Sequence, residues 1–200
     1  GVNPLRFKTE FTVDQESFEE LRRISSGLGL ETKKEDARRL QFGSRLTEDT
    51  DTEFHFLDQK FVLGGGFQVT TIPNRADLEG NLRRIRDARR MADRVIVSFH
   101  CHESGATLAD PPEFLVTFAR ACIDEGADAF VGHGPHVTRG VEIYSGKPIF
   151  YSLGDFIFQN ETVEFQPSHN YEIAGLGHEA TPADFYDARS EKGTRGFPAD

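Results

Sequence analysis

The sequence contains little cysteine, methionine or tryptophan. Its 200 residues include two cysteines, one methionine and no tryptophan. Cys101 and Cys122 lack the paired spacing of a zinc-binding motif, so reduced thiols are the default interpretation. No apolar run approaches the roughly 18 residues needed to cross a bilayer. No basic segment followed by an apolar one indicates a signal peptide. The composition favours a polar globular protein.

Basic side chains are also in the minority, with 23 against 33 acidic ones and a formal net charge of −10. Nucleic acid is therefore not expected as a partner, because phosphate binding needs a concentrated basic surface. Most of the basic residues are arginines, and several gather on a predicted amphipathic helix, 75–93, which Asn74 caps. The arginine-rich side of this helix has two interpretations, an anion site or a solvated face, and the solvated face is favoured.

Four histidines follow two strand-like segments at the points where these segments end. The segments are the apolar run 95–99 and the run 127–132. The histidines that follow them are His100, His102, His133 and His136. Imidazoles grouped at strand ends are a common way to hold a divalent metal ion over a sheet. A hydrogen-bonded loop histidine is the alternative for each of them.

The residues between the two strands predict a helix. Asp110 is its expected N-cap and Pro111 its expected first residue, and Gly126 ends it. A strand–helix–strand unit favours a parallel right-handed crossover. Because sites gather beyond the carboxyl ends of parallel strands, the four histidines should lie near one another. Glu103 is either a proton-transfer group or an exposed loop residue, and Asp155 is predicted to cap a turn.

Two hairpins are predicted elsewhere. One joins residues 53–57 to 60–63, and the other, within 141–154, turns at Ser145-Gly146. The glycines 64–66 lack the Lys-Ser/Thr and the following helix of a phosphate-binding loop, so they are interpreted as a turn.

Three segments carry a more specific pattern: SFHCHE (98–103), GHGPH (132–136) and KPIFYSLGDF (147–156). They resemble motifs of the bacterial capsule-synthesis CapA (poly-γ-glutamate biosynthesis) proteins, relatives of the calcineurin-like metallophosphoesterases. In that family a histidine followed by Trp-Gly ends the first strand, where this chain has Cys101-His102. The family's Gly-His-His-Pro-His box has Gly134 here in place of its middle histidine. Its Ser-Leu-Gly-Asn-Phe signature has Asp155 in place of asparagine.

The resemblance implies an α/β fold of the four-layer α/β/β/α metallophosphatase-like type, present here in part. It also implies one or two divalent metal ions, with Mn, Zn, Fe, Ca and Mg not distinguished. Position by position, it suggests His100, His133 and His136 as metal ligands. His102 has no counterpart in the commoner pattern, and we assign it, with Glu103, to acid/base catalysis because it neighbours a ligand.

The family's remaining ligands lie in a Gly-Asp motif, a further Asp and an Asn-His pair, and none of these occurs before residue 94. We therefore expect an internal part of a longer protein, whose missing ligands come from an N-terminal segment or another chain. Residues 1–160 would be the C-terminal part of a CapA-like domain, with a variable insertion at 31–66. Residues 161–200 are expected to form an irregular tail.

Two classes of function follow. The first is a metal-dependent enzyme, expected to be a hydrolase acting on a phosphoester or on a peptide- or polyglutamate-like polymer. A metal-dependent peptide epimerase is a related alternative, because this scaffold hosts several chemistries. The second class is a non-catalytic component of capsule or poly-γ-glutamate synthesis or export. The sequence leaves the location open between the cytoplasm and the cell envelope.

Overall fold

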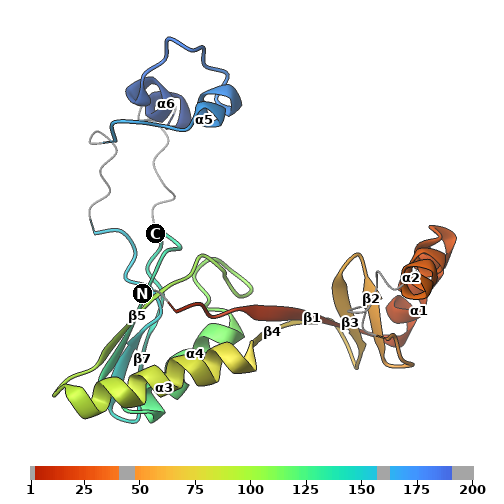
Figure 1. Cartoon of the computed structure of the whole chain (residues 1–200), viewed down its shortest axis with the longest axis horizontal. Helices are drawn as coiled ribbons and strands as arrows, with labels where there is room; N and C mark the ends of the chain where they lie inside the picture. Colours follow the sequence, from red (N-terminus) through yellow and green to blue (C-terminus); the bar gives the residue numbers. More distant parts are fainter. Residues whose placement is uncertain (1–2, 41–47, 157–162, 191–200) are drawn as a thin grey trace. The chain divides into compact units, whose positions relative to one another are not determined.

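The computed structural model describes residues 3–40, 48–156 and 163–190 (Figure 1). The chain forms two compact units. The first comprises the residues up to Val95 together with Pro112–Asp128, and the second comprises Ile96–Pro111 and the residues from Ala129 onward. Each unit contains one four-stranded sheet with both parallel and antiparallel strand pairs. This architecture confirms the predicted α/β class and is consistent with a metallophosphatase-like fold.

The sheet of the first unit has the strand order β2-β3-β1-β4. β1 pairs in parallel with β3 and antiparallel with β4, and β2 and β3 form the predicted hairpin. The segment predicted to be an insertion, 31–66, thus contributes two strands of this sheet. The strands are β1 (Phe7–Val13), β2 (Glu53–Phe56), β3 (Gln59–Leu63) and β4 (Gln68–Pro73).

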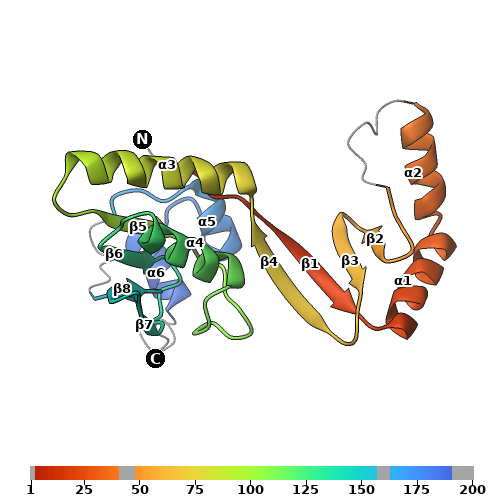
Figure 2. The same ribbon diagram turned by 90° about the horizontal axis from the view of Figure 1, so that it is seen from below.

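Two helices, α1 (Gln15–Gly27) and α2 (Leu30–Arg39), follow β1. Asp14 caps α1 as predicted, because its carboxylate accepts the backbone N–H of Ser17 at 2.9 Å. α1 packs against β2 and β3 (Figure 2). The buried side chains of Val13, Phe18 and Phe54 form the core of this packing. The apolar periodicity of the helix and the alternation of the strands supply this core.

The first unit also contains α3 (Arg75–Met91) and α4 (Glu113–Asp124). The Asn74 side chain caps α3, as predicted, by accepting the backbone N–H of Asp77. The start of α4 is tied to β4, because the Glu113 carboxylate accepts both the backbone N–H and the hydroxyl of Thr71.

The predicted start of α4 is wrong. The N-cap is Pro112 rather than Asp110, and Asp110 instead accepts the backbone N–H and the hydroxyl of Thr107. The cause is the second of two successive prolines. A residue that precedes proline is pushed out of the helical region, so Pro111 cannot begin a helix.

The sheet of the second unit has the strand order β5-β6-β8-β7. β5 and β6 pair in parallel, as do β6 and β8, whereas β7 and β8 form the predicted hairpin. Ser145 and Gly146 both have positive φ angles, as a tight two-residue hairpin turn requires. Phe130 and Ile149 are fully buried. The strands are β5 (Ile96–His100), β6 (Ala129–His133), β7 (Val141–Tyr144) and β8 (Lys147–Phe150).

The segment 161–200 was predicted to be irregular, and its described part corrects this. It contains α5 (Ser168–Ile173) and α6 (Pro182–Arg189). Thr181 and Asp184 form a capping box at the start of α6, with Pro182 at its first position. The sequence carries this helix signal in Thr181, Pro182 and Asp184. Among the described helices, none combines the length and the hydrophobicity needed to cross a membrane.

Candidate functional site

Two histidines end neighbouring strands of the second unit. His100 is the last residue of β5 and His133 the last residue of β6, and the two are paired in the parallel register. Side chains at paired positions share one face of a sheet. Their Nδ1 atoms accordingly lie 2.9 Å apart. The predicted parallel pairing is confirmed, and it places both imidazoles at one edge of the sheet.

The histidine contacts continue on both sides of this pair. His100 Nε2 lies 3.0 Å from His102 Nε2, and His133 Nε2 lies 3.1 Å from the hydroxyl of Ser98. A neutral imidazole has one N–H donor and one acceptor nitrogen. All three contacts are therefore satisfied together when Ser98 donates to His133, His133 to His100, and His100 to His102. Neutral rings account for the whole chain of contacts.

His133 favours the neutral state for a second reason. Its pKa is lowered, first by burial and then by the electrostatic interaction with the neighbouring His100, which opposes a second proton on the pair. Both causes disfavour an added proton. A neutral imidazole keeps a nitrogen lone pair, which is what a metal ligand needs.

His136 occupies the turn that follows β6. Its ring centroid lies 5.5 Å from that of His102, which brings it into the group. Its φ of 63° lies in the left-handed region, which residues other than glycine seldom adopt. Its Nδ1 faces both carboxylate oxygens of Asp155, at 3.0 and 3.2 Å. The side chain of Asp155, for which a turn cap was predicted, thus holds His136.

Gly134 lies at the middle position of the GHGPH turn. Its φ is 122°, and a Cβ atom there would lie only 2.9 to 3.1 Å from backbone atoms of Cys101. Glycine is required on both counts, because a side chain would strain the backbone and meet the neighbouring loop. The turn is thereby held against the segment that carries His102.

Glu103 is directed at Cys101. The thiol of Cys101 lies 3.1 Å from Glu103 Oε2, and burial together with this carboxylate raises the thiol pKa to about 12. Cys101 is therefore a protonated thiol at neutral pH and not an activated nucleophile. Cys122 is likewise buried, and burial raises its thiol pKa to about 12.

Arg139 fixes the backbone that follows His102. Only 3% of its surface is exposed, and its guanidinium donates to the backbone carbonyls of Glu103, at 2.8 Å, and Leu108, at 3.1 Å. The sequence offered no signal for this contact, which joins residues more than 30 positions apart. Burial lowers the pKa of this guanidinium. The acidic neighbours Asp110 and Glu103 partly oppose this shift.

The nitrogen donors suit a divalent metal ion, but their arrangement does not enclose one. In the described part of the chain, no group of three or more His, Cys, Asp or Glu side chains is placed to hold a metal. His100 directs its two ring nitrogens at two different histidines, His133 and His102.

Residues 24–160, more than half of the chain, match the family of the bacterial capsule synthesis protein PGA_cap. The chain is 36% identical over 160 residues to the uncharacterized protein y4sH of Sinorhizobium fredii, covering 80% of this chain and 32% of y4sH. It is 37% identical over 118 residues to the PGA biosynthesis protein CapA of Bacillus subtilis, covering 56% and 30%. With the capsule biosynthesis protein CapA of Bacillus anthracis it is 42% identical over 67 residues, covering 34% and 16%.

The chain belongs to this family of bacterial capsule synthesis proteins. It spans about a third of the length of the curated relatives that match the largest share of it.

Proposed function

We propose that this chain takes part in the synthesis of a capsule-type polymer such as poly-γ-glutamate, as the histidine-bearing portion of a metal-dependent hydrolase. One observation carries the proposal: four imidazoles and the Asp155 carboxylate gather where β5 and β6 end. The printed names of the Bacillus relatives support the biological setting, since both refer to PGA or capsule biosynthesis.

The proposed metal ligands are His100, His133 and His136. His133 and His100 present ring nitrogens to each other at 2.9 Å, and burial lowers the pKa of His133. Asp155 faces the Nδ1 side of His136, and Nε2 is the proposed metal-binding nitrogen of that ring. A bound divalent ion supplies Lewis-acid chemistry, which acidifies water and polarises a carbonyl or phosphoryl oxygen.

His102 is the proposed proton-transfer residue. It touches His100 and lies beside His136, so it reaches the reacting centre without being required as a ligand. Glu103 remains the second candidate for this role. In the structure the Glu103 carboxylate accepts a hydrogen bond from the Cys101 thiol. Glu103 would have to turn away from Cys101 to accept a proton from substrate or water.

The proposed substrates are an amide of a γ-linked glutamate polymer or a phosphoester, with epimerisation of a peptide as a related reaction. A non-catalytic role in polymer synthesis or export is the second candidate function. The contacts among the histidines favour this second candidate, because the rings form these hydrogen bonds with one another and with Ser98 in the absence of a metal.

Replacing His102 tests the enzymatic proposal. We expect His102→Ala to retain metal and to lower turnover of γ-linked glutamate oligomers or of a phosphoester by roughly 10²- to 10⁴-fold, the range for a general acid or base. His178→Ala, in an exposed histidine that pairs with Glu179, is the matched control and should leave turnover unchanged. Loss of metal together with activity would make His102 a ligand, and wild-type turnover in His102→Ala would remove it from the mechanism.

A further inference from the structure

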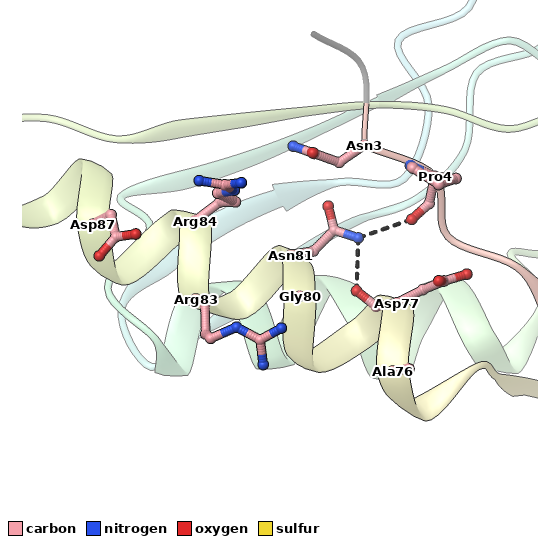
Figure 3. A pocket seen from close by; sticks show the side chains of 9 residues that line it. All are labelled: Asn3, Pro4, Ala76, Asp77, Gly80, Asn81, Arg83, Arg84 and Asp87. Atoms are coloured by element: carbon pink, nitrogen blue, oxygen red, sulfur yellow. Dashed lines mark hydrogen bonds between the residues drawn. The ribbon is translucent and has the colours of Figure 1, made fainter.

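A hollow on the surface of the first unit lies over α3, where the chain that leads into β1 crosses the helix (Figure 3). The Asn81 amide builds one wall, because it donates to the Pro4 carbonyl at 3.0 Å and to the Asp77 carbonyl at 2.9 Å. Gly80 leaves the floor open, since a Cβ atom there would have only Arg83 nearby, at 3.8 Å. The hollow is thus framed by fixed backbone and amide groups.

Two arginines of α3 line this hollow and differ from the other arginines of the helix. Arg83 and Arg84 are exposed and form no ion pair within residues 3–40, 48–156 and 163–190. Arg83 interacts with Glu79 only through its charge. This positive charge contributes to lowering the pKa of the Glu79 carboxyl group. The remaining arginines of the helix are each paired with a carboxylate: Arg75 with Glu79, Arg86 with Glu125, Arg89 with Asp128 and Arg90 with Asp87.

The carboxylates of the hollow are neutralised by arginines outside it. Asp77 accepts two hydrogen bonds from the Arg6 guanidinium at 2.8 Å, and Arg6 lowers the pKa of Asp77 to about 2. Asp87 pairs with Arg90. Each of these pairs carries no net charge, so Arg83 and Arg84 leave the hollow positive on a chain whose net charge is −10.

We propose that this hollow binds carboxylate groups of an acidic polymer, with Arg84 and the neutral Asn3 amide as donors to one group and Arg83 as a second charged donor. Figure 3 shows the side chains of Arg84 and Asn3 on one side of α3 and that of Arg83 extending from the other. Guanidinium groups are suited to carboxylates, because their planar N–H donors match the two oxygens. This inference rests on the proposed function, since γ-linked poly-glutamate is the polymer that it identifies. The hollow belongs to the first unit, whereas the histidines belong to the second.

Binding of a fluorescent γ-linked glutamate oligomer to the full chain tests the inference. Arg83→Gln combined with Arg84→Gln should weaken binding by about tenfold, the loss of two charge-assisted contacts at an exposed site. Binding should also weaken as salt rises, since the contacts are exposed. The matched control combines Arg86→Gln with Arg94→Gln, which removes the same charge from arginines that are already paired, and should bind within about twofold of wild type.

Equal affinity of the oligomer for the wild-type protein and the Arg83/Arg84 variant would overturn the inference. So would an equal loss in the control variant, which would show a general charge effect. Free glutamate and inorganic phosphate are the competing probes, and displacement of the oligomer by either at equal carboxylate or phosphate concentration would show a site for small anions only and contradict polymer binding. Turnover at saturating substrate and metal content report separately on the histidines. Lost oligomer binding with intact turnover, or the reverse, therefore distinguishes the two proposals.

Discussion

At the scale of single residues, Asp155 selects the tautomer of His136. A carboxylate can only accept, so the Nδ1 atom that faces it carries a proton, and in the neutral ring Nε2 is the nitrogen with the lone pair. The same contact helps to hold a residue whose φ of 63° is costly outside glycine. Asp155 occupies the position at which the family motif has asparagine. A carboxylate binds an imidazole N–H more strongly than an amide oxygen does.

Asp155→Asn should therefore weaken divalent-metal binding by roughly tenfold, the lower end of the range for a lost outer-shell partner. Metal titration by calorimetry measures this. Asp187→Asn, at an exposed carboxylate of α6, is the control and should bind metal as the wild type does. Unchanged metal affinity in Asp155→Asn would show that the carboxylate does not tune His136.

Residue-scale contacts were the hardest part of the site to predict. Four histidines at two strand ends indicated a cluster, because parallel strands end at one edge of a sheet. The contact between Asp155 and His136 spans 19 residues and depends on how the segments after β6 and β8 fold. Arg139 gave no signal either, since a buried arginine is unusual and its partners are backbone carbonyls. Pattern and spacing report on strands and helices, not on such contacts.

At the scale of elements, local signals predicted most boundaries. Asp14 and Asn74 cap α1 and α3 as their side chains suggested, and the Ser145-Gly146 turn joins β7 to β8. The errors have physical causes. The double proline delays the start of α4, and the capping box of α6 lies in a segment whose glycine and charge obscure the helix signal.

The GHGPH turn is the element on which the cluster depends most. Gly134→Ala should lower the free energy of unfolding by about 1 to 3 kcal/mol, because the new methyl group meets the Cys101 backbone and φ is unsuitable for alanine. Gly140→Ala is the matched control, with no atom within 4 Å of its Cβ position, and should change stability by less than about 0.5 kcal/mol. Urea denaturation compares the two variants. Equal stabilities would show that the turn tolerates a side chain.

At the scale of the whole molecule, the two proposed regions belong to different units. The second unit carries the histidines, Asp155 and Arg139, whereas the first carries the arginine-lined hollow. Each unit has its own sheet, so each region is built on its own framework. The match to the capsule synthesis family covers residues 24–160. It includes both regions, apart from the residues of the hollow that precede β1.

The central claim is that the histidines at the ends of β5 and β6 bind a divalent metal ion. Titration of the protein with Mn²⁺ or Zn²⁺, followed by calorimetry and by metal analysis of the dialysed protein, tests it most directly. Wild-type protein should bind metal, and His133→Ala and His136→Ala should each bind it at least about tenfold more weakly, as expected for the loss of one ligand among few. His178→Ala should match the wild type. Equal affinity in all four proteins, or no metal bound by the wild type, would contradict the claim.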